Sequence, residues 1–261
     1  MTKNNRTWIL LRGLAREKGH WGPFLENFEH RFRGDVVLPI DLPGAGEFCD
    51  ASCPKNMAEV FQFVRGQVIQ RAESAANFSL LAISMGGMVA MEWMKQKPQE
   101  LEACVLINTS LKSLSPIYQR LRWQIWQRFL HIISIQNNRE RERSIIELLM
   151  NNHASQQQAL PLWAKIATER PMSYGNFINQ LMAAARFEGL DAKPDVPVLL
   201  LNSLGDRFTD PSCSEALHEK WSWPIHRHPW AGHDLPWDDA EWVLNHIGQW
   251  IESKDAKRHQ S

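Results

Sequence analysis

Short apolar segments alternate with longer helical patterns along most of this chain, and no other feature constrains its fold as strongly. Six segments have the length and composition of strands: residues 7–11, 35–39, 78–83, 103–108, 196–202 and 224–228. Most are apolar throughout, as strands are when helices cover both faces of a parallel sheet. Helical patterns lie between them at residues 56–73, 87–95, 212–220 and 240–253. The alternation predicts an α/β fold with a mostly parallel six-stranded sheet flanked by helices.

The alternation stops between residues 111 and 190, where only helical patterns appear. Apolar residues recur at every fourth position in residues 116–135, and helical segments follow at residues 144–150, 159–168 and 173–187. We interpret this region as an all-helical lid inserted between two strands. The chain then divides into a first part of the α/β core (residues 1–110), the lid (residues 111–190) and a second part of the core (residues 191–261).

Composition excludes several classes of protein. The 29 basic and 29 acidic side chains leave no net charge, which argues against a nucleic-acid binder. No apolar run approaches the about 20 residues that span a bilayer, and Arg12 interrupts the apolar stretch near the N-terminus, so neither a membrane span nor a secretory signal is expected. The four cysteines form no disulfide framework, which predicts free thiols and a cytoplasmic protein. Twelve tryptophans predict a large core, an apolar pocket or both.

The strand at residues 78–83 runs into Ala82-Ile83-Ser84-Met85-Gly86, and a helical pattern follows. A serine nucleophile on a sharp strand-to-helix turn needs small residues two positions before and after it, and Ala82 and Gly86 meet that need. Such a turn projects the hydroxyl above the sheet and places N–H groups of a helix N-terminus beside it, where they can stabilise negative charge. Ser84 is therefore the candidate nucleophile.

A serine nucleophile needs a histidine base and a carboxylate that orients this base. Asp206 follows the strand at residues 196–202, and His233 lies in a loop of small residues after the last strand. Asp210 is the alternative acid. An acid after the strand at residues 103–108 is excluded, because residues 108–111 contain no carboxylate. The order Ser84, Asp206, His233 is the chain order of a known hydrolase triad.

Other polar residues near these positions have structural interpretations. His226 and His228 are two residues apart in a strand and so point to the same face. Two ligands without a third make a poor metal site, so no metal is expected. No organic cofactor is expected either. The aspartates after the candidate base are expected to cap the final helix: Asp234, Asp238 and Asp239.

Over nearly its whole length the chain resembles the α/β-hydrolase superfamily, and three further motifs carry this resemblance. Arg12-Gly13-Leu14 follows the first strand, where the family usually has His-Gly. Residues 41–46 look like the D-x-P-G-x-G loop of the family. Residues 230–233 are similar to the loop that bears its catalytic histidine. The resemblance implies that the backbone N–H groups of Leu14 and Met85 form an oxyanion hole. The most similar subgroup is the small capped carboxylesterases, such as those acting on pimeloyl-carrier-protein methyl ester.

Three departures from the family pattern stand out. Arg12 replaces the usual histidine, Ser203 stands where a glycine often precedes the acid by three residues, and the usual N-terminal hairpin is not expected. The resemblance assigns the chemistry to the N–H of Leu14. We therefore expect the replacement of histidine by Arg12 to affect how the loop is supported more than it affects activity.

The predicted lid carries the information on substrate. Residues 112–145 contain seven basic and two acidic side chains, which form either a solvated helix face or a docking surface for an acidic partner, such as an acyl carrier protein or the phosphates of coenzyme A. The docking hypothesis rests on Arg120, Arg122 and Arg128. An acyl pocket is expected to be lined by several large apolar side chains: Trp21, Met88, Trp123, Trp126 and Phe177.

Together these observations predict a serine hydrolase that cleaves a carboxylic ester with an apolar, short-to-medium acyl group through an acyl-enzyme intermediate. A thioesterase or acyltransferase with the same residues is the alternative within this chemistry. The alternative from a different class is a non-catalytic ligand-binding protein with a hydrolase fold.

Overall fold

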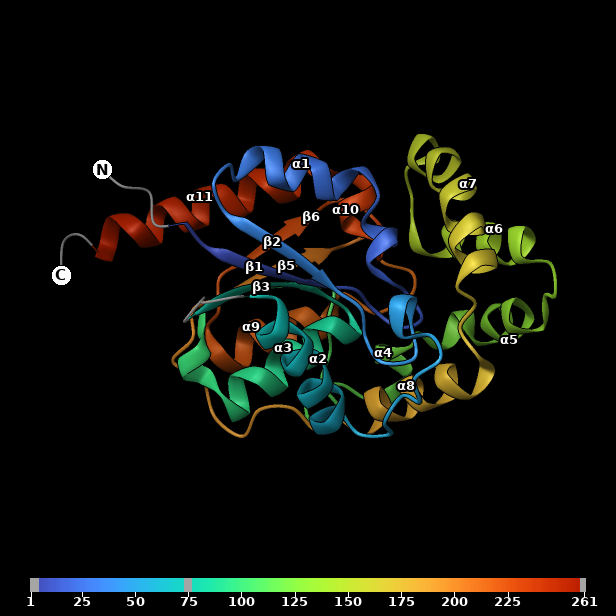
Figure 1. Cartoon of the computed structure of the whole chain (residues 1–261), viewed down its shortest axis with the longest axis horizontal. Coiled ribbons are helices and arrows are strands. Elements are labelled where there is room, and N and C mark those ends of the chain that lie inside the picture. The colour runs from blue at the N-terminus through green and yellow to red at the C-terminus, as the bar shows by residue number, and fades with distance from the viewer. Residues whose placement is uncertain (1–4, 73–76, 259–261) are drawn as a thin grey trace.

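A computed structural model describes residues 5–72 and 77–258, and it contains one six-stranded sheet (Figure 1). Neighbouring strands are parallel throughout, in the order β2-β1-β3-β4-β5-β6. The predicted fold class is confirmed, and strand ends differ from the predicted ones by a residue or two. The strands are β1 (Thr7–Leu11), β2 (Val36–Ile40), β3 (Phe78–Ile83), β4 (Leu101–Ile107), β5 (Val198–Ser203) and β6 (Ile225–His228).

Helices cover both faces of the sheet, because successive strand side chains point to opposite faces. In β1, Ile9 and Leu11 belong to the core under α2, α3 and α9, whereas Trp8 and Leu10 belong to the core under α1 and α11. Figure 1 shows the two layers below and above the sheet. Their helices are α1 (Pro23–Arg31), α2 (Met57–Arg71), α3 (Met85–Gln96), α9 (Ser212–Trp221) and α11 (Ala240–Arg258), with the short α10 (Leu235–Asp238) before α11.

Five helices lie between β4 and β5, and we call them the helical insertion. They pack beyond one end of the sheet, at the right of Figure 1. A small core around the fully buried Trp163 and the buried Ile132 and Ile146 packs three of them together, α5, α6 and α7, whereas α8 contacts α2 and α4 contacts α9. The helices are α4 (Ile117–Arg120), α5 (Trp126–Ser134), α6 (Asn138–Leu149), α7 (His153–Glu169) and α8 (Tyr174–Arg186).

Several details differ from the sequence prediction, among them the starts of α6 and α7, which lie six residues before the predicted ones. Helix α1 lacked a clear pattern, because only Phe24 and Phe28 of its nine residues are buried. The single helix predicted for residues 116–135 is wrong: the backbone is extended at Leu121, with φ −131°, and a 3-10 turn precedes α5. The N–H of Arg122 donates instead to the carbonyl oxygen of Phe208, at 3.0 Å. A tertiary hydrogen bond thus interrupts a pattern that reads as continuous.

Two glycines within helices provide a matched test of how closely α3 approaches the sheet. A Cβ at Gly86 would lie 2.6 Å from the carbonyl oxygen of Leu11, whereas nothing lies within 4 Å of a Cβ at Gly66 in α2. Gly86→Ala is expected to lower the free energy of unfolding by about 1–3 kcal/mol through overpacking. Gly66→Ala should raise it by about 0.5–1 kcal/mol. Urea unfolding followed by circular dichroism measures both, and a neutral Gly86→Ala would contradict the close approach.

Candidate active site

Ser84 lies where β3 turns into α3, in a backbone conformation that non-glycine residues rarely adopt. Its φ is 56° and its ψ −119°. Two groups at the end of β4 hold this turn: the carbonyl oxygen of Ile107 accepts from the N–H of Ser84 at 2.9 Å, and the Thr109 hydroxyl donates to the carbonyl oxygen of Ser84 at 2.8 Å. A strained backbone kept in place by its surroundings is a frequent property of functional sites.

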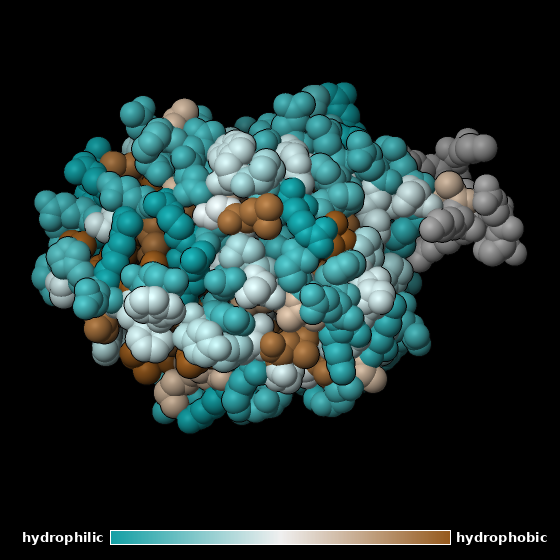
Figure 2. Space-filling model, turned by 180° about the vertical axis from the view of Figure 1, so that it is seen from behind, coloured by the Kyte–Doolittle hydropathy of each residue, from teal (hydrophilic) through white to brown (hydrophobic). Residues whose placement is uncertain are grey.

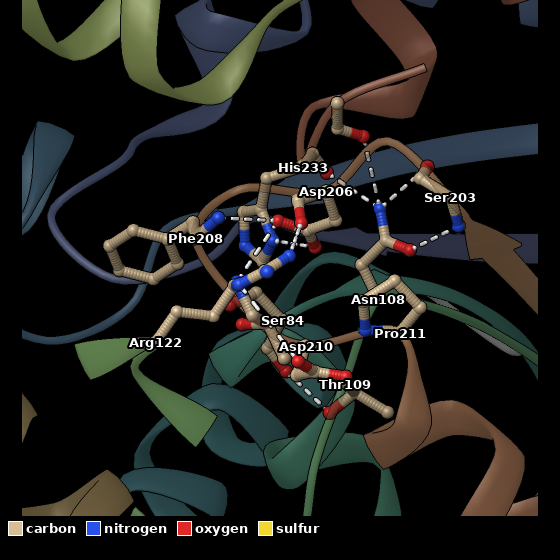
Figure 3. Close-up of polar contacts among 12 residues, drawn as sticks. Ser84, Asn108, Thr109, Arg122, Ser203, Asp206, Phe208, Asp210, Pro211 and His233 are labelled. Carbon is tan, nitrogen blue, oxygen red and sulfur yellow. Dashed lines mark hydrogen bonds and ion pairs between the residues drawn. The ribbon is translucent and has the colours of Figure 1, made fainter. Parts of the chain in front are cut away.

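Asp206 and His233 form a buried pair, with Asp206 Oδ2 2.7 Å from His233 Nδ1 (Figure 3). The other carboxylate oxygen accepts from the backbone N–H groups of Phe208 and Thr209, at 2.7 and 2.9 Å. The loop after β5 therefore fixes the carboxylate, and the carboxylate orients the imidazole. The alternative acid, Asp210, accepts from the N–H of Ser212 and lies near Arg122 instead.

Asn108 ties the loops after β4, β5 and β6 together, and the sequence analysis gave it no role. Its Nδ2 donates to Ser203 Oγ at 3.0 Å and to the carbonyl oxygen of His233 at 2.9 Å, and its Oδ1 accepts from the N–H of Ser203 at 2.8 Å (Figure 3). Ser203, the departure from the glycine of the family pattern, thus takes part in the support of the base. The signal in the sequence was an asparagine at the end of a buried strand, a residue type that tolerates the φ of 46° found here.

Leu14 and Met85 carry the N–H groups that the resemblance assigned to an oxyanion hole. No hydrogen bond involves the N–H of Leu14 within the part of the chain that the structure describes. Met85 is the first residue of α3, so its N–H has no intrahelical acceptor. The loop that carries Leu14 passes Ser84 closely, because a Cβ at Gly13 would lie 3.0 Å from Ser84 Cβ. The geometry is compatible with two donors beside the hydroxyl.

Ser84 and His233 line one cavity of about 410 Å³, between the sheet and the helical insertion. Apolar side chains of the insertion make up much of its wall: Phe129, Ile132, Ile133, Leu148 and Phe177. Of the pocket residues predicted from the sequence, only Phe177 is among them. Trp21 and Met88 are buried in the core, and Trp123 and Trp126 are exposed by 63% and 43%. The prediction of these four as pocket residues is wrong. Trp123 and Trp126 were placed on an unbroken helix that the structure does not have, and the sequence pattern could not tell that Trp21 and Met88 point into the core.

Arg12 makes a buried ion pair with Asp234, the residue after the candidate base. Arg12 Nη1 donates to Asp234 Oδ1 at 3.1 Å and Nη2 to Oδ2, and the guanidinium lies 4.8 Å from the ring centroid of Trp21. Asp234 occupies the N-cap position of the short α10, but its side chain makes no capping hydrogen bond and pairs with Arg12 instead, so the predicted cap of the final helix is wrong. The pair joins the loop after β1 to the loop after β6.

Of the other two predicted helix caps, one is confirmed and one is wrong. Asp239 accepts from the N–H of Trp242 at 3.0 Å and caps α11. Asp238 instead accepts from the N–H groups of Gly232 and Asn152, at 2.6 and 2.8 Å, and so links the loop of the candidate base to the helical insertion. Burial raises the pKa of Asp238.

Three side chains of the insertion hold the loop that follows β1, residues 12–17. Gln180 of α8 is fully buried: its Oε1 accepts from the N–H of Ala15 at 2.9 Å, and its Nε2 donates to the carbonyl oxygen of Pro43 at 3.1 Å. Two ion pairs continue the contact. Arg16 Nη1 donates to Glu142 Oε2 at 2.6 Å, and Arg170 Nε donates to Glu17 Oε2 at 2.7 Å. Burial and the nearby Arg16 lower the pKa of His20, which keeps it neutral inside this cluster. The loop is thus fixed from the insertion side.

The remaining predicted groups serve the fold. Arg120 is buried and donates to the carbonyl oxygens of Ala184 and Ala185, so it cannot meet a partner as predicted. Within residues 5–72 and 77–258 no three side chains gather as metal ligands. His228 Nε2 lies 3.2 Å from Asp239, and its Nδ1 accepts from the N–H of Ala231. The four cysteines are free, and burial raises the pKa of Cys213 to about 11.

The Arg12–Asp234 pair can be tested by a double-mutant cycle. Arg12→Gln or Asp234→Asn leaves one buried charge without its partner and should lower the free energy of unfolding by about 3–5 kcal/mol. The double variant should lose much less than the sum, because neither charge remains. Urea unfolding of the four proteins measures the coupling, and additive losses would contradict the pair.

Comparisons with known proteins bear on the family and the fold. A model of the alpha/beta hydrolase family matches residues 8–246. A comparison with curated proteins finds no match. Among similar solved structures, a thermophilic esterase from Thermogutta terrifontis is 20% identical, with a TM-score of 0.73 over 97% of this chain and 91% of that one. A lipase-esterase related protein from Clostridium acetobutylicum is 17% identical, with a TM-score of 0.70 over 94% and 93%. These likenesses show the fold, and the family model covers most of the sequence: the chain belongs to the alpha/beta hydrolase family.

Proposed function

We propose that this protein is a serine hydrolase that cleaves a carboxylic ester with an apolar, short-to-medium acyl group. The observation that carries the proposal is the buried Asp206–His233 pair, 2.7 Å apart, beside the same cavity as Ser84 on its strained turn. A nucleophile, a base and a group that orients the base are the set that acyl transfer to a serine needs.

In the proposed mechanism Ser84 Oγ attacks the ester carbonyl carbon while His233 takes the hydroxyl proton. Asp206 stabilises the imidazolium that forms, and the N–H groups of Leu14 and Met85 stabilise the negative oxygen of the tetrahedral intermediate. His233 then gives the proton to the leaving alkoxide, so that the alcohol departs and an acyl ester on Ser84 remains. Water, deprotonated by His233, attacks this ester, and the imidazolium returns the proton to Ser84 Oγ as the acid departs.

The cavity supports an apolar acyl group of limited length. Its volume of about 410 Å³ is at the lower end of sites for small ligands. Aromatic and aliphatic side chains of the insertion form much of its wall, beside charged groups such as Arg141 and Arg170. In this proposal the helical insertion acts as a lid that shields the acyl-enzyme and sets acyl length. A thioester substrate, or transfer to an alcohol instead of water, uses the same residues. Both are tested by product analysis with thioesters and added alcohols.

The proposed chemistry predicts a sharp contrast between two neighbouring aspartates. Asp206→Asn should lower kcat for p-nitrophenyl esters by about 10⁴-fold, because the imidazole loses its orientation, and Ser84→Ala should lower it at least as much. Asp210→Asn, the matched control, should stay close to wild type, because its carboxylate contacts the N–H of Ser212 and not His233. Initial rates across acyl lengths measure this. A non-catalytic binding protein would show no Ser84-dependent hydrolysis and no labelling by a fluorophosphonate.

A second contrast tests the support of the proposed oxyanion hole by the insertion. Gln180 holds the N–H of Ala15, the residue after Leu14, whereas Asn176, one turn earlier on α8, binds the N–H of Cys53 at 2.9 Å. Gln180→Met should lower kcat at least about tenfold with little change in KM, because a displaced donor stabilises the transition state poorly. Asn176→Leu removes comparable buried hydrogen bonds and should reduce thermal stability with a smaller effect on kcat. Equal effects on kcat would contradict a positioning role for Gln180.

A further inference from the structure

The outer side of the helical insertion exposes an unusual concentration of large apolar side chains. Of ten such exposed side chains in the described part of the chain, five lie within residues 117–130. Trp123 and Leu130 are exposed by 63% and 68%. Large apolar side chains exposed together on one segment of a folded protein mark a candidate binding surface. We call these five residues the outer insertion surface: Ile117, Tyr118, Trp123, Trp126 and Leu130.

Folding of the insertion accounts for only part of this surface, through the hydrogen bond that Trp126 Nε1 donates to the carbonyl oxygen of Leu121 at 3.0 Å. The inward face of α5 and of the turn before it already supplies what the core and the cavity need, through Ile125, Phe129, Ile132 and Ile133. Trp123, Trp126 and Leu130 follow one another at i, i+3 and i+7 on the other side of the same segment. A helix that packs on one side normally has a polar opposite face. The second apolar stripe therefore has a use other than folding.

The segment that carries the surface is basic in sequence, although two of its arginines have acidic neighbours. Residues 111–139 contain five basic side chains and no acidic one. Arg122 and Arg128 lie 3.9 and 3.4 Å from the carboxylates of Asp210 and Glu147, which are on other elements. Arg139 and Arg143 of α6, the helix that packs beside α5, are exposed and make no ion pair among the described residues. The helix that packs beside α5 thus carries two exposed cations without an ion pair, with one exposed carboxylate, Glu140, between them.

We propose that the outer insertion surface docks this protein on an anionic lipid surface. Tryptophan and tyrosine suit the boundary between headgroups and acyl chains, because their rings are apolar and their N–H or O–H groups are polar. Leu130 and Ile117 add apolar contact, and Arg139 and Arg143 add attraction to anionic headgroups. Such docking is peripheral, because no helix in the described ranges has the length and apolar character of a bilayer span. Figure 2 shows apolar groups interspersed with polar ones over the insertion, at the left of that view.

Docking in this orientation would bring lipid close to the cavity. The helix that presents Leu130 outward presents Phe129 and Ile133 to the cavity that Ser84 also lines. An apolar ester carried in a lipid layer would then have a short path to the site. This consequence rests on the proposed function, whereas the docking itself does not.

Sedimentation with vesicles tests the docking. The wild-type protein should sediment with mixed phosphatidylcholine–phosphatidylglycerol vesicles at low salt, with a blue shift of its tryptophan fluorescence, and much less with phosphatidylcholine alone. Trp123→Gln with Leu130→Gln should weaken binding about tenfold or more. Arg139→Gln with Arg143→Gln should weaken it about fivefold per arginine at low salt and less at high salt. The matched control is Val36→Gln with Ile69→Gln, which removes two apolar side chains exposed by 50% and 51% elsewhere, and it should bind as wild type.

The proposal would be overturned if the wild type did not sediment with the mixed vesicles, or if the control substitutions weakened vesicle binding as much as those at Trp123 and Leu130. It would also be overturned by a dimer in analytical ultracentrifugation that the Trp123 and Leu130 substitutions abolish. The last would assign the surface to a second copy of the chain, and retention by an acidic protein without vesicle binding would assign it to a protein partner. Thermal unfolding checks that each variant is folded. Hydrolysis of a water-soluble p-nitrophenyl ester should be unchanged in all of them, so failure of the docking and failure of the proposed chemistry give different results.

Discussion

The close approach of α3 to β1 is the contact on which the arrangement of the site depends. Gly86 permits it, because any side chain there would collide with the backbone carbonyl oxygens of Leu11 and Arg12. The approach places the start of α3 beside the loop that follows β1, and so brings Gly13 against Ser84. Both proposed oxyanion donors belong to these two adjoining segments. A side chain at position 86 would push α3 away from β1 and so separate Ser84 from the loop that carries Leu14.

Buried polar side chains then join the loops at this end of the sheet. Asn108 connects the loops after β4, β5 and β6, and Arg12 with Asp234 connects those after β1 and β6. Gln180, Glu142 and Arg170 connect the first of these loops to the insertion. Burying charged pairs costs desolvation that their attraction only partly offsets, so we interpret these pairs as fixing the loop conformation more than as adding stability. A site assembled from separate loops needs a defined loop conformation more than it needs added stability.

The elements that could be predicted from the sequence are those whose signal is local. Strands buried on both faces appear as short apolar runs, and the turn at Ser84 appears as small residues at fixed offsets from a serine. Asp206 and His233 followed from their place after the last two strands, and the structure brings them together. Asn108 and Gln180 were not found, because a single polar residue in a loop or a helix gives no sign of the distant backbone group that it binds. The break at Leu121 and Arg122 was missed for the same reason: the carbonyl oxygen that interrupts the helix belongs to Phe208, far along the chain.

The sequence by itself therefore determined the α/β fold, the chain order of the candidate nucleophile, acid and base, and the presence of a helical region between two strands. These depend on periodicity and on residue types at short spacing, which a chain carries whatever its folded surroundings. Only the tertiary structure decided which large apolar side chains line the cavity, which lie in the core and which face solvent. It also decided that Arg120 is buried and that Arg12 pairs with Asp234. The physical reason is that burial and ion pairing depend on distances between segments remote in the chain, and packing of the whole molecule sets those distances.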